Sequence, residues 1–572
     1  MKTVFKYLKP YYFRMTVGFF IKFTGTIMDL LLPWILAYII DHVIKKENLN
    51  EILRWGGLMV VCSIIAMLAN ILANRMASMV ARDTTKRIRH DLFSKIMYLS
   101  NDYVDEITIP SLTSRMTTDT YNVHRMVGMM QRIGVRAPIL LIGGLAVTLT
   151  LDPVLTLVLL AVLVLLVIFT YIVSSKGIPL YKVVQESSDD MIRVLRENIT
   201  GIRVIKALSK SNHEKKRFDK VNSKVMRDEN KANMVLNTIR PTMNFLLQGG
   251  LVGIIIVGAY RVNAGVSDVG KILAFLTYFT IILNAMLSIT RIFTVFSRSI
   301  ASANRIQEVL QIVPTDTKIY DDFEEEKDKG FISFKDVSFS YNKVANDISN
   351  ISFSIKKGET LGILGATGSG KSTIVKLLMR FYDPDKGEIR VDGKEIRGYR
   401  LKELRDKFGV VFQNDALFRD TVAENIKLGR QISVEDIHRA IDHAQAKDFI
   451  ESKGLDFMLS IKGANFSGGQ KQRLLIARAL AGRPEILILD DASSALDYKT
   501  DAALRKELKE HYFGTTTIII AQRISSIKHA EHILVLDEGR ILGYGTHEEL
   551  MATNELYQEI ASTQMGEMVD EE

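Results

Sequence analysis

The feature that most constrains how this chain can fold is a series of six long apolar segments before about residue 300. Most of them approach the ~20 residues that a helix needs to cross the ~30 Å hydrocarbon layer of a membrane. Because lipid offers no hydrogen-bond partners to the backbone, each segment is predicted to be a helix. The segments cover residues 15–40, 56–80, 127–151, 154–173, 243–260 and 272–296.

The connections between these segments alternate in length and charge. Those after the first, third and fifth segments are short, whereas those after the second and fourth are long and rich in Lys and Arg. Basic residues concentrate on cytoplasmic loops, so both long connections and both chain ends are expected in the cytoplasm of a bacterial cell, the chain being a multi-pass protein of its cytoplasmic membrane. The long connections keep helical spacing, which predicts helices that extend roughly 30 Å beyond the membrane.

Two breaks interrupt the helical pattern of the long connections. One lies at Ile109-Pro110-Ser111 and the other near Thr200-Gly201. Each break could form a tip at which a short transverse helix contacts another domain. The alternative is an ordinary solvated helical hairpin.

The overall composition agrees with a membrane setting. The formal net charge is +9, but the basic residues alternate with membrane-length apolar segments and lack a base-stacking aromatic pattern, so no nucleic-acid partner is expected. The single cysteine, Cys62, excludes a disulfide framework and a metal cluster built from thiols.

Several polar residues lie inside the apolar segments. Lys22 and Asp29 are seven residues apart on the first segment, and Asn284 lies on the last. Polar groups at such positions are candidates to line an internal substrate cavity. The alternatives are hydrogen bonds between helices and, for Lys22, extension of the side chain to the membrane interface.

The composition changes near residue 313, which divides the chain into a membrane domain at residues 1–312, an acidic linker at residues 313–330 and a second domain at residues 331–572. Strands alternate with helices in the second domain, which predicts an α/β core. Strands are expected at residues 331–341, 351–355, 361–364, 410–413, 486–489 and 517–520, and helices at residues 373–379, 434–452 and 465–481.

A phosphate-binding loop follows the third of these strands. Residues 365–372 match the pattern G-x-x-x-x-G-K-[ST] between a buried strand and a helix. Backbone N–H groups of such a loop surround phosphate oxygens, while Lys371 can reach the outer phosphates and Ser372 can hold Mg²⁺. The sequence therefore predicts a nucleoside-triphosphate site that contains Gly365, Thr367, Gly368, Ser369, Gly370, Lys371, Ser372 and Thr373.

Two further motifs belong with this loop. Asp490 ends an apolar strand downstream of it and is the expected second Mg²⁺ partner. Phe466-Ser467-Gly468-Gly469-Gln470 opens a helix and offers a second anion site. One nucleotide cannot use both sites if they are far apart on one chain. Two domains that face each other head to tail would resolve this, because each nucleotide then lies between the loop of one domain and the Ser-Gly-Gly of the other.

These motifs, with the looser ones at residues 111–119 and 201–207, resemble those of ABC exporter half-transporters, and most closely the subunits of bacterial heterodimeric multidrug exporters. The resemblance covers nearly the whole chain. It implies an all-α six-helix transmembrane domain with long cytoplasmic extensions, followed by an α/β P-loop ATP-binding domain of ABC type, with ATP and Mg²⁺ as cofactors. It also implies adenine stacking on Tyr341, a Mg²⁺-sensing Gln413, coupling helices near Ser111 and Ile205, and a signature acting in trans at Ser467, Gly468, Gly469 and Gln470.

At two positions the chain departs from the pattern of ATPase-competent members of that family. Asp491 stands where the family has a catalytic Glu after the Walker B Asp490, and Gln522 stands where it has a His. The Asp carboxylate falls about 1 Å short, and such a misplacement can cost on the order of 100-fold in rate. Gln522 cannot supply an imidazole to the transition-state charge. The ATP site of this chain is therefore expected to bind more than it hydrolyses.

The intact signature then serves a partner's nucleotide, so the sequence favours a heterodimer with a second half-transporter. The predicted function is ATP-driven efflux of amphipathic compounds, with an ATPase activity located mainly at the partner's site. Lipid or peptide cargo and a slow homodimeric exporter are the alternatives within the family. A nucleotide-gated regulator or channel is the alternative from another class.

Overall fold

The structure is a computed structural model that describes residues 1–313, 330–413 and 415–569. Nearly all of the predicted acidic linker, residues 314–329, lies outside the described residues. The chain divides into two compact units, one formed by Met1–Lys95 with Leu112–Gln311 and the other by Ile96–Ser111 with Ile312–Glu572. The break at the linker thus coincides with a unit boundary, but a short segment from the first half belongs to the second unit.

The first unit is entirely helical in its described residues. Six helical stretches are long and apolar enough to cross a membrane, one for each predicted segment. The longest single helix has 49 residues, or roughly 74 Å at 1.5 Å per residue, so the spans do extend well beyond a bilayer. The helices are α1 (Lys2–Leu8), α2 (Tyr12–Tyr38), α3 (Leu49–Met97), α5 (Ile109–Ser114), α6 (Thr120–Leu151), α7 (Pro153–Thr200), α8 (Ile202–Ala207), α9 (Ser211–Leu236), α10 (Ile239–Asn263) and α11 (Val269–Gln311).

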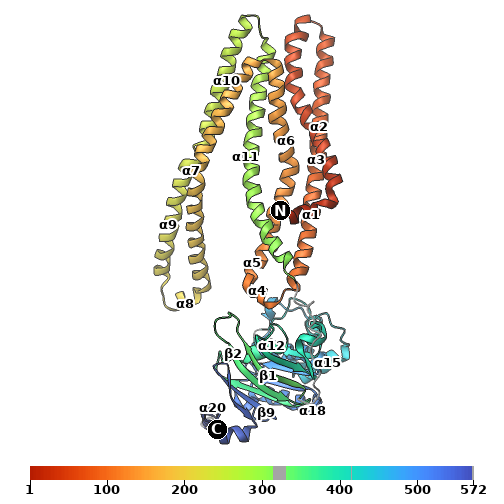
Figure 1. Cartoon of the computed structure of the whole chain (residues 1–572), viewed down its shortest axis with the longest axis vertical. Coiled ribbons are helices and arrows are strands. Elements are labelled where there is room, and N and C mark those ends of the chain that lie inside the picture. The colour runs from red at the N-terminus through yellow and green to blue at the C-terminus, as the bar shows by residue number, and fades with distance from the viewer. Residues whose placement is uncertain (314–329, 414, 570–572) are drawn as a thin grey trace. The chain divides into compact units, whose positions relative to one another are not determined.

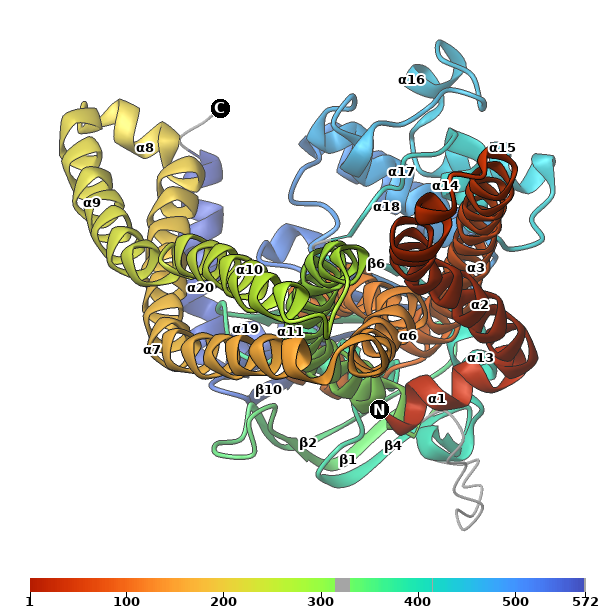
Figure 2. The ribbon, with the colours of Figure 1, turned by 90° about the horizontal axis from the view of Figure 1, so that it is seen from above.

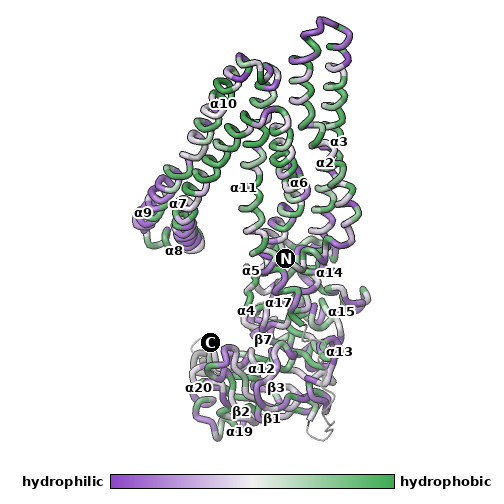
Figure 3. The backbone as a smooth tube through the Cα atoms, turned by 45° about the horizontal axis from the view of Figure 1, so that its top comes forward, coloured by the Kyte–Doolittle hydropathy of each residue, from purple (hydrophilic) through white to green (hydrophobic). Residues whose placement is uncertain are grey.

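Helix α11 packs along α6 and α2, whereas α7 packs against α9 and α10 (Figure 1). The short α8 joins α7 to α9 at the end of a long hairpin, as Figure 2 shows. Hydrophobic residues dominate α2, α3, α6, α7, α10 and α11, while α9 and the adjoining end of α7 are hydrophilic (Figure 3). This change of polarity along the hairpin is what a helix leaving a membrane for water requires.

Two buried carboxylates fix the short connections of the first unit. Asp152 accepts hydrogen bonds from the N–H groups of Val154 and Leu155 at the start of α7, at 3.0 and 3.3 Å, and forms an ion pair with Arg261. Asp41 accepts from the N–H groups at the start of α11, the closer at 2.6 Å. A negative charge at a helix N-terminus accepts hydrogen bonds from the free backbone N–H groups. It also interacts favourably with the positive end of the helix dipole.

Both predicted breaks contain a short helix, although the first lies earlier than expected. Helix α4 (Asn101–Ile107) precedes the Ile109-Pro110-Ser111 segment, and Thr108, with φ of +71°, separates it from α5. The chain turns at Thr108, one residue before the predicted break, and the short helices α4 and α5 lie on either side of this turn. Helix α8 follows Gly201 directly and contains Ile205, as expected.

The second unit contains two sheets. A four-stranded antiparallel sheet has the order β2-β1-β4-β5, and a six-stranded sheet has the order β10-β9-β3-β8-β7-β6 with only β10 antiparallel. The strands are β1 (Ile332–Phe339), β2 (Ile348–Ile355), β3 (Thr360–Gly365), β4 (Lys386–Val391), β5 (Lys394–Glu395), β6 (Phe408–Val411), β7 (Ile486–Asp490), β8 (Thr516–Ile520), β9 (His532–Asp537) and β10 (Arg540–Gly545).

Helix α12 (Lys371–Leu378) shares one hydrophobic core with residues of both sheets. A second core joins the strands β6 and β7 to α15 and α17. Parallel strands covered by helices form the α/β core that the sequence predicted. The remaining helices of this unit are α13 (Leu401–Asp406), α14 (Val422–Lys427), α15 (Val434–His443), α16 (Lys447–Glu451), α17 (Gly468–Ala481), α18 (Tyr498–His511), α19 (His547–Thr553) and α20 (Glu555–Val569).

One predicted helix is divided in two. The helix expected over residues 434–452 ends at His443, and α16 begins only at Lys447. Gln445 lies between them in the left-handed region, with φ of +56°, which no residue inside a right-handed helix adopts. The helical region expected over residues 434–452 is therefore present as two helices.

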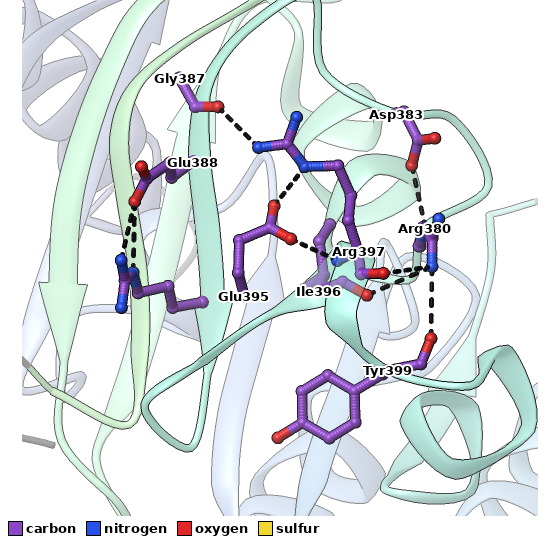
Figure 4. Close-up of polar contacts among 9 residues, drawn as sticks. Arg380, Asp383, Gly387, Glu388, Glu395, Ile396, Arg397 and Tyr399 are labelled. Carbon is purple, nitrogen blue, oxygen red and sulfur yellow. Dashed lines mark hydrogen bonds and ion pairs between the residues drawn. The ribbon is translucent and has the colours of Figure 1, made fainter. Parts of the chain in front are cut away.

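A buried arginine holds the turn after α12 (Figure 4). Arg380 donates to the carbonyl oxygens of Arg397 and Tyr399, both at 3.3 Å, and to the carboxylate of Asp383 at 2.9 Å. Hydrogen bonds from a buried guanidinium are strong because both partners are shielded from water. The turn that contains Tyr382 is thereby tied to the segment after β5.

Candidate functional site: a nucleotide site and a polar membrane cavity

The phosphate loop runs from the end of β3 to the start of α12, as predicted. Gly368 and Gly370 have φ of +89° and +95°, a conformation that glycine adopts without strain. A Cβ atom on Gly370 would also lie 2.6 Å from the side chain of Ile348. The loop therefore depends on glycine for its curvature and for close packing against β2.

The side chain of Lys371 lies over its own loop. Its ammonium donates to the carbonyl oxygens of Gly365 and Ala366, at 2.7 and 2.6 Å. Burial lowers the pKa of this ammonium, while the nearby Asp490 and Asp491 oppose that shift. The charge of Lys371 is thus placed at the centre of the loop, where phosphate oxygens would be received.

A cavity of about 240 Å³ brings the loop together with residues from four other parts of the chain. The Ser372 hydroxyl donates to Asp490 at 3.0 Å, and Gln413 lies on the same wall. Burial raises the pKa of Asp490, because a carboxylate loses solvation in this site. The predicted residues that line the cavity are Thr367, Gly368, Gly370, Lys371, Ser372, Thr373, Gln413, Asp490, Asp491 and Gln522.

The two positions that depart from the family pattern face this cavity. Asp491 follows the buried end of β7 and has φ of +54°, a conformation that Asp tolerates better than most residues. Burial raises the pKa of its carboxyl group as well. Gln522 follows β8 and is exposed. Both residues therefore reach the cavity from the ends of neighbouring parallel strands, β7 and β8.

Tyr341 does not line the cavity but lies beside α12. Its hydroxyl approaches the Thr373 hydroxyl at 3.4 Å, and Lys376 lies 5.2 Å from the ring centre. Edge-to-face contacts with Phe339 and Tyr382 hold the ring at 4.9 and 5.1 Å. The aromatic ring is therefore fixed next to the helix that follows the phosphate loop. This position is compatible with the predicted stacking on a base.

The signature residues lie at the start of α17 and not on the walls of the cavity lined by Lys371, as far as the described residues define it. Ser467 and Gln470 form a capping box there. The Ser467 hydroxyl oxygen accepts from the Gln470 N–H at 3.3 Å, and the Gln470 side chain accepts from the Ser467 N–H at 3.1 Å. Ser467 and Gly468 are exposed and Gly469 is half-buried. The second anion site of the sequence is thus separate from the first on the same chain.

Helix α4 is docked within the nucleotide-binding unit. Tyr382 donates a hydrogen bond to Asp105 at 2.5 Å. Burial, together with this bond, raises the pKa of the Tyr382 hydroxyl. A cavity beside the contact is lined by residues 97–102 and by the turn that Arg380 holds. The segment of the first half that reaches this unit therefore contacts it through the turn directly after α12.

A separate cavity in the helical unit contains two of the three predicted membrane residues. Asp29 of α2 and Asn284 of α11 line it together with Arg136 of α6, and Arg136 forms an ion pair with Asp29 at 3.0 Å. The volume is about 410 Å³. Lys22 lies elsewhere: it is buried and donates to Asn70 and Asn74 of α3, at 2.8 and 3.1 Å.

Sequence reasoning missed two of these positions. Arg136 is an ionisable residue inside a predicted span, which is the signal that could have identified it. Asp347 lines the nucleotide cavity from the loop before β2, and no motif marks it. Its place follows only from the pairing of β2 with β1.

Comparison with known proteins identifies the chain. Residues 15–286 match the family model of the ABC transporter transmembrane region, and residues 348–494 match that of the ABC transporter. The Bacillus subtilis ABC transporter ATP-binding protein YfiB is 34% identical over 574 residues, covering 99% of both chains. This chain belongs to the ABC transporter family.

Other similarities agree with this assignment. The ABC transporter ATP-binding protein YknU of Bacillus subtilis is 33% identical, covering 98% of this chain and 97% of its own. The solved structure of a bacterial Atm1-family ABC exporter with ATP bound has the same fold, with a TM-score of 0.80 and 23% identity over 97% of this chain and 98% of that one.

As an ABC half-transporter, the chain combines six membrane spans with one ATP-binding domain. It is an ATPase whose activity is coupled to transport, and such half-transporters dimerise. The protein is a multi-pass component of the bacterial cytoplasmic membrane with the ATP-binding domain in the cytoplasm.

Proposed function

We propose that this ABC half-transporter is one subunit of a heterodimeric exporter, and that its own ATP site retains nucleotide with little hydrolysis. The observation that carries the proposal is that Asp491 and Gln522 line the same cavity as Lys371 and Ser372. A catalytic carboxylate must reach the attacking water, and Asp491 is one methylene shorter than the Glu of competent family members. Gln522 offers an amide in place of an imidazole.

The residues of this cavity fit ATP with Mg²⁺. The Ser372 hydroxyl and the Asp490 carboxylate are already 3.0 Å apart, and the Gln413 side chain borders the same space. Hydroxyl, carboxylate and amide oxygens are the ligands that Mg²⁺ prefers, and the bound ion neutralises phosphate charge. Lys371 would then leave the loop carbonyls and donate to the outer phosphate oxygens.

The signature of this subunit is proposed to act on the partner's nucleotide. Ser467, Gly468 and Gly469 lie at an exposed helix N-terminus, which favours an anion. Two ATP-binding domains that face each other head to tail would place this terminus over the opposite phosphate loop. ATP then favours the closed state by the additional charge interactions that its phosphates make there.

Efflux of amphipathic compounds is the cargo assignment that we favour. The cavity of Asp29, Arg136 and Asn284 holds both signs of charge within largely apolar helices, which suits a cargo with a polar end and an apolar body. Lipid headgroups combine both charges, so a lipid flippase is the second candidate.

The asymmetry of the two sites provides the test. The chain is purified from its native membrane together with its partner subunit, and Ser467→Ala is compared with Asp491→Ala. We expect Ser467→Ala to reduce ATP turnover by at least ten-fold, whereas Asp491→Ala leaves most of it. The chain purified alone should hydrolyse ATP slowly. Equal losses in the two variants, or brisk hydrolysis by the chain alone, would show that this site is itself catalytic and would favour a homodimer.

A further inference from the structure

Two histidines and a glutamate gather on the ATP-binding domain, away from the nucleotide cavity. His443 is the last residue of α15, and Glu507 and His511 lie one turn apart at the end of α18. One ligand atom from each residue lies within 4.8 Å of the other two. None of the three belongs to the phosphate loop or to the signature, and none lines the nucleotide cavity.

The distances within this cluster suit a tetrahedral metal ion. Zn²⁺ binds His nitrogen and carboxylate oxygen at about 2.0–2.2 Å, so two ligand atoms on a tetrahedron are about 3.3–3.5 Å apart. His511 Nε2 and Glu507 Oε2 are 3.4 Å apart. The rings of His443 and His511 lie nearly parallel, with centres 4.5 Å apart, so a small rotation of His443 brings its free nitrogen toward the same point.

Neighbouring groups prepare His443 to act as a ligand. Its Nδ1 lies 3.2 Å from the Tyr512 hydroxyl, and a proton donated from Nδ1 to that oxygen leaves the lone pair on Nε2. Burial and the proximity of His511 lower the pKa of His443, which favours the neutral imidazole that metals bind. The nearest cation, Arg439, is paired with Asp436 and so opposes a metal ion less.

We propose that His443, Glu507 and His511 form a binding site for a divalent transition-metal ion such as Zn²⁺. Two imidazoles and one carboxylate favour Zn²⁺ or a similar ion over Mg²⁺, which prefers oxygen ligands. Three protein ligands leave a fourth position for water. The side chain of His511 is 49% exposed, so an ion can enter from solvent.

The ion would join two helices that the sequence separates by more than fifty residues. Helix α15 belongs to the core built on α17, and α18 begins at Tyr498, directly after the Ser494-Ala-Leu-Asp497 segment. A metal bridge between the ends of α15 and α18 would restrict movement of one relative to the other. Metal binding would therefore stabilise the domain and slow any step that needs the two helices to separate.

The test uses the full-length protein in detergent, with any affinity tag removed. Co²⁺ is titrated while its visible absorption is recorded, because tetrahedral Co²⁺ gives intense bands. We expect these bands for the wild type, with at least ten-fold weaker binding in His443→Ala, His511→Ala and Glu507→Gln. His438→Ala is the matched control, since His438 is an exposed histidine on α15 outside the cluster. This control should bind Co²⁺ as the wild type does.

A second measurement guards against variants that fold poorly. Zn²⁺ should raise the melting temperature of the wild type and of His438→Ala by several degrees, excess Mg²⁺ should not, and a chelator should reverse the shift. Each variant must also retain ATP binding, which shows that the domain is folded. Equal Co²⁺ affinity in the wild type and the three cluster variants would overturn the proposal, as would octahedral Co²⁺ spectra alone.

Discussion

At the scale of single residues, we propose that the nucleotide cavity combines groups that bind ATP with groups that hydrolyse it slowly. Lys371, Ser372 and Asp490 occupy the places that phosphate and Mg²⁺ binding require. Asp491 and Gln522 share the same cavity, yet one side chain is too short and the other carries no imidazole. In the proposed function, the difference between holding ATP and hydrolysing it depends on these two side chains.

The double substitution Asp491→Glu with Gln522→His should convert this site toward hydrolysis. A longer carboxylate recovers about 1 Å of reach, so we expect ATP retained by the complex at this site to turn over at least ten-fold faster. The measurement is the lifetime of trapped radiolabelled ATP. Glu is less suited than Asp to φ of +54°, so the variant should also lose about 1 kcal/mol of stability.

Asp491→Asn is the matched control, because it keeps the size of the side chain and removes its charge. This variant should retain ATP as long as the wild type does. An unchanged lifetime in the double variant would mean that geometry beyond these two positions limits hydrolysis.

At the scale of elements, the short helix α4 is anchored to the ATP-binding domain at the turn that contains Tyr382. Tyr382 is buried, and its hydrogen bond to Asp105 is short. The turn that presents Tyr382 is held by Arg380, whose guanidinium spans the carbonyls after β5. Movement of the ATP-binding domain therefore reaches α4 through a rigid turn.

Tyr382→Phe should loosen α4 without changing ATP affinity. Loss of a buried hydrogen bond to a charged partner costs about 1–3 kcal/mol locally. We expect faster amide hydrogen exchange in residues 101–107, unchanged exchange in α17, and less transport per ATP hydrolysed. Tyr544→Phe is the control, since Tyr544 donates to the Ser354 carbonyl within the same domain and lies away from α4. Unaltered exchange in α4 would show that other contacts hold this helix.

Some helices and strands could be predicted from sequence patterns alone, and others could not. The six spans and the strands around the phosphate loop were predicted because apolar runs and the loop motif are local signals. The break at Gln445 was not, because it is a left-handed residue that no Gly or Pro marks. Strands β4, β5, β9 and β10 were missed as well, although β4 pairs with β5 and β9 with β10 in hairpins of neighbouring strands.

The candidate site divides in the same way. The phosphate loop, Gln413 and Asp490 lie together as their motifs predicted, whereas the pairing of Asp29 with Arg136 depends on how α2 and α6 pack. Lys22 has the same polar character as Asp29, yet its neighbours on α3 bury it. Which polar residue lines a cavity depends on how the helices pack together. The hydrophobic periodicity of the sequence does not contain that information.

At the scale of the whole molecule, the ion pair of Asp29 and Arg136 lines the cavity of the membrane domain and can contact a cargo there. Asp29 is provided by α2, Arg136 by α6 and Asn284 by α11, so the cavity exists only when three spans pack together. Charges within a span are costly and are usually retained for function.

Asp29→Asn should therefore change which cargo is transported. The substitution leaves Arg136 unpaired, so we expect weaker transport of cationic compounds and equal or stronger transport of anionic ones. Uptake into inverted membrane vesicles that contain both subunits measures this selectivity. Asp268→Asn is the control, because Asp268 pairs with Lys45 and Lys271 outside the cavity. If Asp29→Asn left transport of every cargo unchanged, the pair would have only a packing role.

The capping box at the start of α17 has a consequence for the reversibility of the transport cycle. The Ser467 hydroxyl and the Gln470 side chain already satisfy each other's backbone donors in the separated domain. Contact with a partner's nucleotide would then exchange hydrogen bonds instead of adding them, and an exchange of this kind yields little net free energy. Closure would rest mainly on charge, so a small loss of phosphate charge is enough to reopen the dimer. The contact between the signature and the nucleotide would therefore be broken easily in each transport cycle.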